Sequence, residues 1–279
     1  MRWLIDWNLA FDPFHPPRRV YIPTPVHEEA VGGIVQFVES GQFWGSITAP
    51  AGYGKTAILD EAIARIKGPR IRAVRVDGAI DATTLYAQIA AALGRRTPPG
   101  ASLAIAWRAL REARALCRAM RSNVVVAIDH IEMLHDHESL HRLATLESSP
   151  HSRTCVLTCG RPEADCESSS KTHDLLDIER SGLRIRPRRL SRDETAAYLN
   201  GKLAAAGCAG AAFSPRAISR IHVHSQGIPR AIDRTAKPAL VECSRRGAEI
   251  VGPAVVDAVA LECDPDFDRL DSIENLVTS

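Results

Sequence analysis

Apolar residues in the first two thirds of the chain follow two alternating patterns. Short apolar or alternating runs are typical of strands, and they occur at 44–48, 71–76, 124–128 and 154–159. Between these runs, apolar residues recur at intervals of three and four, which is typical of helices with one buried face; such stretches cover 30–38, 57–66, 83–93 and 102–120. Strands that alternate with helices favour a parallel sheet with helices on both faces.

The strand pattern ends near residue 190, and the sequence beyond it predicts helices only. Ser191 and Glu194 have the spacing of a capping box, in which each side chain binds a free backbone amide at the start of a helix. Three more helices are predicted to begin at Pro215, Pro229 and Pro253, because proline is tolerated in the first turn of a helix. The chain is therefore expected to combine an α/β core with a C-terminal all-α region.

Four parts are expected along the chain. Residues 1–40 contain five prolines and form an entry segment that is expected to pack on the core. The α/β core is expected at 41–190 and the helical lid at 191–262. Residues 263–279 form an acidic tail that is predicted to be disordered, because segments of this composition bury little apolar surface.

The composition, 45% hydrophobic and 24% charged, is typical of globular proteins. The longest apolar runs are far shorter than the roughly 18 residues that a membrane-spanning helix needs, and the N-terminal residues lack the apolar region of a signal peptide. The seven cysteines are odd in number and include no C-x-x-C pair, which favours reduced thiols over a disulfide framework or a zinc site. These features predict a cytoplasmic protein without direct membrane insertion.

A glycine-rich segment after the strand at 44–48 is the strongest chemical signal in the sequence. It contains Gly52, Gly54, Lys55 and Thr56 in the order typical of a phosphate-binding loop, and a predicted helix follows. Small residues let backbone amides turn towards a polyphosphate, and a helix start favours negative charge. Lys55 would contact the β- and γ-phosphates, while Thr56 would offer its hydroxyl to Mg²⁺. The sequence therefore predicts ATP or GTP binding.

The residues expected to line the nucleotide are Pro50, Ala51, Gly52, Tyr53, Gly54, Lys55, Thr56 and Ala57. The segment departs from the pattern G-x-x-x-x-G-K-[ST] at the first position, where Ala49 replaces glycine. Alanine is tolerated there only if its φ is not strongly positive. An accidental glycine-rich turn is the alternative interpretation, but the series of strand, loop and helix argues against it.

Asp129 ends the apolar run VVVAID and is the candidate Walker B aspartate, which would hold Mg²⁺ together with Thr56. The alternative is an aspartate that caps a turn at the end of a strand. Most hydrolysing relatives have a glutamate at the next position, whereas here His130 follows, with Glu132 two residues further on. Either side chain could orient the attacking water, so the sequence predicts nucleotide binding more directly than hydrolysis.

Four histidines lie near this aspartate, at positions 130, 135, 137 and 141. They could form a metal site, but their spacing matches no familiar ligand pattern. A polar surface loop is the favoured interpretation.

Together these elements resemble AAA+ ATPases, and in particular the group that contains ExeA (GspA) of type II secretion and the transposition ATPases TniB, TnsC and MuB. The resemblance covers about residues 7–262 and includes the opening WNLAFDPF…VYIPTPVHEEAVGGIVQFVESGQFWGSI, which is similar to the ExeA-type opening. It implies a three-layer P-loop NTPase core with a parallel sheet, a C-terminal all-α lid, and ATP as the nucleotide. No guanine-reading N-K-x-D motif is visible.

The resemblance also implies roles for single residues. CVLTCGRPE is similar to the strand of this group that ends in Gly-Gln-Pro-Glu, which makes Thr158 the expected sensor-1 residue and the adjacent Cys159 the alternative. ERSGLRIRPRRLSRDETAAYL is similar to the stretch before the lid, so Arg180 or Arg184 would be the arginine finger that completes a neighbouring subunit's site. HSQGIPRAIDR resembles the Gly-[IN]-Pro-Arg motif and implies that Arg230 contacts the γ-phosphate. A solvated surface charge is the alternative for each arginine.

The net charge of +2 favours no particular partner, but residues 183–192 hold five arginines and no acid. Further arginines lie in the predicted lid, at positions 216, 220, 230, 234, 245 and 246. Such residues could bind the phosphates of double-stranded DNA. The alternative is a mixture of nucleotide-site and subunit-interface charges.

Three functions remain open from the sequence. The first is a regulator that multimerises with ATP into a ring or filament on DNA, as transposition ATPases do, and acts on a protein such as a transposase. The second is a secretion-type ATPase like ExeA; the membrane segment and peptidoglycan-binding region of that type are not seen in the sequence, so anchoring would need a separate partner. The third is an ATP-gated switch with weak or no hydrolysis, for which His130 is the main support.

Overall fold

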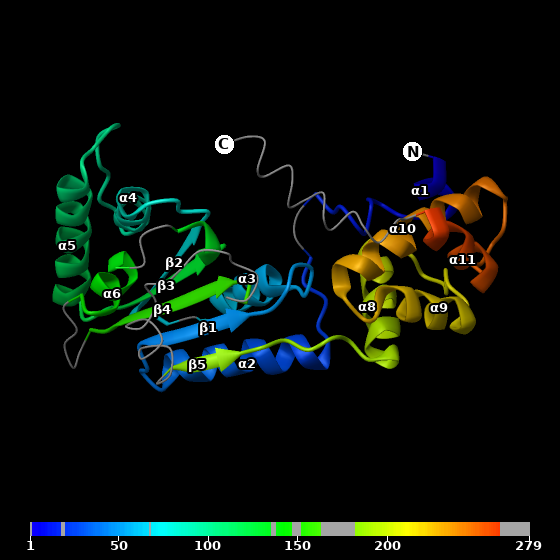
Figure 1. Ribbon diagram of the computed structural model, residues 1–279, viewed down its shortest axis with the longest axis horizontal. Coiled ribbons are helices and arrows are strands. Elements are labelled where there is room, and N and C mark those ends of the chain that lie inside the picture. Colours follow the sequence, from blue (N-terminus) through cyan, green and yellow to red (C-terminus); the bar gives the residue numbers. More distant parts are fainter. Residues whose placement is uncertain are drawn as a thin grey trace. The chain divides into compact units, whose positions relative to one another are not determined.

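The computed structural model describes residues 2–17, 20–66, 68–134, 138–146, 152–162 and 182–262, which form two compact units (Figure 1). The α/β unit extends from Val26 to Arg188. The helical unit combines the residues up to Pro25 with those from Arg189 onwards. Within the described ranges, no helix is long and apolar enough to cross a bilayer.

The α/β unit is built on a five-stranded sheet in the order β2-β3-β4-β1-β5, in which every pair of neighbours is parallel. The strands are β1 (Trp44–Thr48), β2 (Ile71–Asp77), β3 (Asn123–Asp129), β4 (Thr154–Gly160) and β5 (Leu183–Ile185). The register pairs Asp77 with Asp129, and Thr48 with Gly160. These four residues are the last of their strands, so the chain segments that leave them start at one edge of the sheet.

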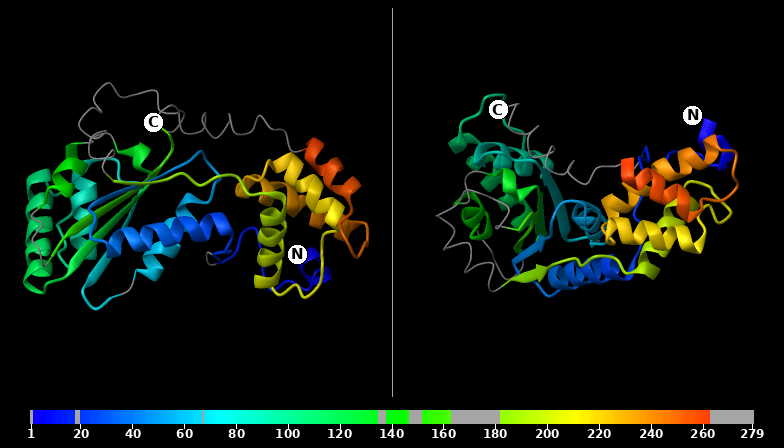
Figure 2. Two further views of the ribbon diagram at one scale, coloured as in Figure 1. Left: turned by 90° about the horizontal axis from the view of Figure 1, so that it is seen from below. Right: turned by 45° about the vertical axis from the view of Figure 1, so that its right-hand side comes forward.

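Helices cover both faces of this sheet (Figures 1 and 2). The face in contact with α2 (Pro25–Glu39) and α3 (Lys55–Arg65) is called the α3 face below. The opposite face carries the main core and packs against α4 (Ala82–Ala92), α5 (Leu103–Ala119) and α6 (Glu138–Ala144). The three-layer α/β fold expected from the sequence is confirmed.

Side-chain alternation along β3 explains why the apolar run at 124–128 is continuous. Val124, Val126 and Ile128 belong to the core shared with α4, α5 and α6, and the residues between them are equally buried on the α3 face. Both faces of a central parallel strand are covered, so both sets of positions are apolar. Asp129 is the one charged residue of this strand, and its odd number places it on the α3 face.

Several short elements were not predicted from the sequence. They are α1 (Arg2–Asp6), the 3-10 turn η1 (Ile131–Met133), α6 and β5. β5 is only three residues long, pairs with β1 alone, and lies in the arginine-rich stretch, where an edge strand needs little apolar alternation. The predicted helices were found within one or two residues of their expected ends, except that α2 begins at Pro25, five residues before the predicted stretch 30–38.

The helical unit contains α8 (Arg192–Ala205), α9 (Pro215–Ser225), α10 (Pro229–Arg245) and α11 (Pro253–Glu262). The predicted capping box at the start of α8 is present, with both reciprocal hydrogen bonds formed. Pro215 and Pro229 occupy the first turn of their helices, as predicted.

The first 25 residues differ from the expectation for the entry segment. α1 lies against α10, and Trp7 Nε1 donates a hydrogen bond to Leu240 O at 3.1 Å. Ala10 N also donates to Ala206 O at 2.7 Å. These residues therefore belong to the helical unit, while α2 belongs to the α/β unit, so the segment 1–40 is divided at Pro25. The predicted disorder of the tail concerns residues 263–279, which lie outside the described residues.

Candidate nucleotide-binding site

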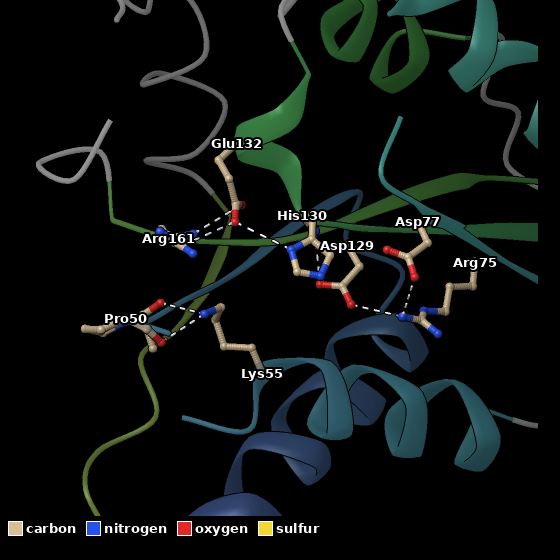
Figure 3. A network of polar contacts seen from close by, with 9 residues as sticks. Pro50, Lys55, Arg75, Asp77, Asp129, His130, Glu132 and Arg161 are labelled. Atoms are coloured by element: carbon tan, nitrogen blue, oxygen red, sulfur yellow. Dashed lines mark hydrogen bonds and ion pairs between the residues drawn. The ribbon is translucent and has the colours of Figure 1, made fainter. Parts of the chain in front are cut away.

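The loop between β1 and α3 has the backbone that phosphate binding requires. Gly52 and Gly54 adopt positive φ angles of 85° and 80°, which favour glycine. Ala49 is not among the residues with positive φ, so alanine fits at the first position of the motif. Lys55 Nζ points back into the loop and donates hydrogen bonds to the carbonyls of Ala49 at 2.7 Å and Pro50 at 3.0 Å (Figure 3).

A histidine of α2 supports the end of this loop. His27 is 4% exposed, and its Nε2 atom lies 2.9 Å from the position that a Cβ atom on Gly54 would occupy. Glycine is therefore needed at this position for two reasons, the positive φ and the close approach of an imidazole. Gly54 is also the N-cap of α3, a helix of 11 residues, whose first amides have no partner within the helix and are available to an anion.

Asp129 is a buried carboxylate with a complete set of partners. Its side chain is 2% exposed. Oδ1 accepts a hydrogen bond from His130 N at 3.0 Å, and Oδ2 accepts one from Arg75 Nη2 at 3.0 Å. Burial alone would raise the pKa of Asp129, but hydrogen bonds from Thr56, Cys159 and Arg75, together with His130, hold it below the ordinary value of 3.8. The carboxyl group is thus ionised at neutral pH.

The donor set suits a magnesium ion bound with a nucleotide. The hydrogen bond between the Thr56 hydroxyl and Asp129 places two oxygen ligands side by side at the start of α3, and Mg²⁺ prefers oxygen ligands. Lys55 lies close enough to interact electrostatically with Asp129. Burial lowers the pKa of Lys55, and the nearby Cys159, Glu132 and Asp129 oppose that shift.

Arg75 brings an additional positive charge to this edge of the sheet. It lies on β2, and its odd number places it on the α3 face beside Asp129. Its guanidinium contacts three carboxylates. Nη1 lies 3.0 Å from Asp60 Oδ1. Nη2 lies 3.0 Å from Asp129 Oδ2 and 3.4 Å from Asp77 Oδ2 (Figure 3). Its Nε atom is buried and has no hydrogen-bond partner among the described residues.

The turn after β3 positions the carboxylate of Glu132 near the loop between β1 and α3. His130 has a positive φ of 55°, and the 3-10 turn η1 follows it. This turn brings Glu132 over the end of β4, where Oε2 lies 2.8 Å from a Cβ atom built on Gly160. Glu132 Oε2 accepts a hydrogen bond from Arg161 N at 3.4 Å, and Oε1 lies 3.8 Å from Arg161 Nε and 3.6 Å from His130 Nδ1. Figure 3 shows Glu132 between these two residues.

Cys159 reaches the site, whereas Thr158 does not. Cys159 is on the α3 face, its thiol donates a hydrogen bond to Asp129, and burial followed by the charge of Asp129 raises its pKa. Thr158 points to the opposite face, and its hydroxyl is 3.5 Å from Gly45 O. Of the two sensor-1 candidates, Cys159 rather than Thr158 therefore lies beside Asp129, because neighbouring residues of a strand face opposite sides; the sensor-1 role stays a prediction.

Of the three predicted arginines, the structure describes Arg184 and Arg230. Arg184 is an exposed residue of β5, at the edge of the sheet. Arg230 is an exposed residue in the first turn of α10, in the helical unit. Arg180 lies outside the described residues, as do His135 and His137 of the histidine cluster. The roles of these arginines stay predictions.

Comparisons with known proteins agree with this geometry. The sequence pattern of a family described as AAA domain matches residues 38–166, which include the loop, Asp129 and Cys159. The chain is 24% identical over 248 residues to general secretion pathway protein A of Aeromonas hydrophila, a match that covers 88% of this chain and 45% of that protein. The chain thus spans less than half the length of this relative.

Three solved structures are similar over most of the chain. The crystal structure of Cdc6p from Pyrobaculum aerophilum has a TM-score of 0.71 at 17% identity, covering 88% of this chain and 69% of that one. Drosophila ORC bound to DNA has a TM-score of 0.71 at 16% identity, covering 94% and 65%. The Aeropyrum pernix ORC2 protein, in ADPNP–ADP complexes, has a TM-score of 0.70 at 16% identity, covering 90% and 71%. The chain has the AAA+ fold.

Within this AAA+ fold, the sequence motifs predicted the residues of the loop and Asp129 but not all of the side chains around them. Lys55, Thr56 and Asp129 are brought together as predicted from their spacing. Arg75 belongs to no motif, and Arg161 lies in the quoted segment CVLTCGRPE but was not singled out. Counting alternate positions back from Asp77 in β2 would have placed Arg75 on the same face as Asp129, but only once the pairing of β2 with β3 was known.

Proposed function

We propose that this chain binds Mg–ATP at the loop Pro50–Ala57, hydrolyses it with Glu132 as the residue that orients water, and couples the nucleotide state to assembly with other copies. The observation that carries the proposal is the meeting of Lys55, Thr56 and Asp129 behind two left-handed glycines at one edge of the sheet.

Binding follows from what each residue can offer to a triphosphate. The amides after Gly52 and at the start of α3 can donate to phosphate oxygens, and the helix start adds a partial positive charge. The Lys55 ammonium is held by two neutral carbonyls, which an anion would outcompete. Adenine as the base is supported by the ADPNP–ADP complexes of the structurally similar Aeropyrum ORC2 protein.

Magnesium would be held by the Thr56 hydroxyl and the Asp129 carboxylate, directly or through water. When bound, it would neutralise charge on the β- and γ-phosphates. Asp129 already carries the negative charge that this role needs, because its pKa lies below 3.8.

Glu132 is better placed than His130 to orient the attacking water. It is 19% exposed on its side chain, close enough to Lys55 to affect its pKa, and fixed by Arg161 at the end of β4. The imidazole of His130 is 51% exposed, so solvent competes for it. A carboxylate two residues beyond its usual position can reach the site because His130 adopts a left-handed conformation and η1 turns the chain back.

Assembly is supported by the arginines that the resemblance to AAA+ ATPases singles out. An arginine that stabilises phosphoryl charge from a neighbouring subunit makes hydrolysis depend on assembly. Arg184 is exposed at the edge strand, and Arg180 precedes it by four residues. We expect one of them to act in trans, and Arg230 of the helical unit to contact the γ-phosphate.

Two partner classes follow, each with its own support. A regulator that assembles on double-stranded DNA, as in transposition, is supported by the arginine-rich stretch 183–192 and by the DNA bound in the similar Drosophila ORC structure. A secretion-type role is supported by the similarity to general secretion pathway protein A. Electron microscopy with a non-hydrolysable ATP analogue, with and without duplex DNA, separates them: DNA-dependent assemblies that dissolve as salt rises indicate the first class.

Binding is tested with a fluorescent ATP analogue. Lys55→Ala should weaken binding at least about 100-fold, because the charge-assisted contacts to two phosphates are lost. Arg72→Ala is the matched control, since Arg72 is an exposed cation of β2 outside the site. Undiminished binding by the Lys55 variant would overturn the assignment of the loop.

Hydrolysis is tested by phosphate release. Glu132→Gln should keep nucleotide binding and lower turnover by roughly 10²- to 10⁴-fold, the usual contribution of a positioned general base. Glu138→Gln, on the exposed start of α6, is the control. If His130→Ala abolishes turnover while Glu132→Gln does not, the roles are reversed; if wild-type protein releases no phosphate in any assembly, the chain is an ATP-gated switch.

A further inference from the structure

Arg75 is the cationic side chain that contacts the carboxylate of Asp129, the candidate Walker B residue, among the residues that the structure describes. We propose that Arg75 is a positioning residue that acts as the counter-ion of Asp129 when no divalent cation is bound, and that it moves towards Asp60 and Asp77 when the cation binds. This inference rests on the proposed binding of Mg–ATP. It predicts that the Arg75 guanidinium competes with Mg²⁺ for the carboxylate of Asp129.

The need for a counter-ion follows from burial. Asp129 is 2% exposed and ionised, and an uncompensated carboxylate at such a depth is costly. The Arg75 guanidinium, 29% exposed, supplies the compensating charge at 3.0 Å through a direct hydrogen bond. The other donors to this carboxylate, the Thr56 hydroxyl, the Cys159 thiol and the backbone N–H of His130, are neutral.

The same contact opposes a divalent cation. His130 N donates to Oδ1 of Asp129 and Arg75 donates to Oδ2, so a cation or its bound water would share a carboxylate oxygen with one of these donors. A guanidinium and Mg²⁺ next to one carboxylate repel each other, and the repulsion is stronger in a partly buried site than in water. Cation binding is therefore favoured when Arg75 leaves Oδ2.

The surroundings of Arg75 provide a place for it to go. Asp60 lies one turn after Thr56 on α3 and already holds Nη1 at 3.0 Å. Asp77, 57% exposed, is 3.4 Å from Nη2, longer than the contact to Asp129. The buried Nε has no partner among the described residues, so a shifted guanidinium has an unused donor for either carboxylate. Arg75 can therefore pair either with Asp129 or with Asp60 and Asp77, and in both arrangements its positive charge lies next to a carboxylate.

The experiment measures the Mg²⁺ concentration that half-saturates the binding of a fluorescent ATP analogue to the full chain. An arginine next to an aspartate changes the proton affinity of the carboxylate by roughly 10- to 1000-fold. We expect Arg75→Gln to lower the half-saturating Mg²⁺ concentration about tenfold, at the low end of that range. Arg72→Gln removes the same charge from the exposed part of β2 and should leave the value within about twofold of wild type.

Asp60 gives an opposite and independent test. Asp60→Asn weakens the alternative partner, so Arg75 should remain on Asp129 and the half-saturating Mg²⁺ concentration should rise about threefold or more. In the double variant Arg75→Gln/Asp60→Asn, the value should match that of Arg75→Gln alone. Arg75→Lys, which keeps the charge in a shorter side chain, should fall between Arg75→Gln and wild type; it also serves if Arg75→Gln does not fold.

Two results would overturn the proposal: a half-saturating Mg²⁺ concentration that is unchanged in Arg75→Gln, or one that rises, which would mean that Arg75 assists the cation. Nucleotide binding in EDTA should be alike in wild type and Arg75→Gln. If wild-type protein binds no nucleotide at any Mg²⁺ concentration, the proposed function fails instead. The two failures are thus distinguishable.

Discussion

Substitution of Gly54 by alanine tests the geometry of the phosphate-binding loop. Gly54 has a φ of 80°, and a Cβ atom there would lie 2.9 Å from Nε2 and 3.3 Å from Cε1 of the buried His27. The left-handed conformation costs a non-glycine residue about 1–2 kcal/mol. Displacing a well-packed neighbour adds about 1–3 kcal/mol. We therefore expect Gly54→Ala to lower the free energy of unfolding of the α/β unit by about 2–5 kcal/mol.

A matched glycine separates the two contributions. Gly100 has a φ of 70°, and no atom lies within 4 Å of its Cβ position. Gly100→Ala should therefore cost only the conformational part, about 1–2 kcal/mol. In Gly54→Ala/His27→Ala, removal of the imidazole should relieve the clash, so the double variant should lose less stability than the sum of the two single variants, by about 1 kcal/mol or more.

The assay is unfolding in denaturant, followed by the fluorescence of Trp44 and Trp107 of the α/β unit. Trp3 and Trp7 of the helical unit are replaced by phenylalanine in every variant so that the signal reports one unit. Equal losses for Gly54→Ala and Gly100→Ala, within about 0.5 kcal/mol, would refute the close approach of His27. Additivity in the double variant would refute it independently.

Further predictions concern the core and the helical unit. Burial raises the pKa of the Cys155 thiol from 9.0 to about 12, so the folded state holds this proton more tightly than the unfolded state; stability is complete below pH 9 and falls by about 1.4 kcal/mol per pH unit above it. Denaturation between pH 9 and 10.5 should show a shallower decline of stability with pH in Cys155→Ala than in the wild type. Arg114→Met should destabilise the α/β unit by about 3 kcal/mol or more in denaturant, because Arg114 is 3% exposed and donates three hydrogen bonds, two to Ser152 and one to Thr154 at the start of β4. Arg118→Met, exposed on the same helix, should cost under about 0.5 kcal/mol. Ser191→Ala should lower the stability of the helical unit by about 1 kcal/mol, measured by thermal melting, through loss of the cap of α8.

The loop and the sheet could be predicted because their signals are local. Gly52, Gly54 and Lys55 are adjacent in sequence, and their conformations follow from residue type and from the strand and helix on either side. The run that ends at Asp129 is apolar at every position before the aspartate, which is typical of a central parallel strand with both faces covered. Capping and proline rules likewise placed the helix starts after residue 190.

The positions of Arg75, Cys159 and Glu132 depend on strand pairing and backbone conformation, which cannot be derived from the sequence motifs. Arg75 meets Asp129 because β2 pairs with β3, and 54 residues separate the two. Cys159 rather than Thr158 reaches Asp129 because odd positions of β4 lie on the α3 face. The face is set by the register of β4 against β3, which the sequence motif does not specify. Glu132 approaches the loop through the left-handed backbone of His130, which residue type alone does not predict.

The division of the chain at Pro25 and Arg188 makes the helical unit discontinuous, with the whole α/β unit inserted between its two pieces. On a ribosome, Trp7 therefore emerges 233 residues before Leu240, the residue whose carbonyl it binds. The inserted unit can complete its sheet during synthesis, while the outer one must wait for the last helices. A fragment starting at Arg189 would lack α1 and the Trp7 contact, so expression trials that cut between the units should retain the first 25 residues by circular permutation rather than by simple truncation.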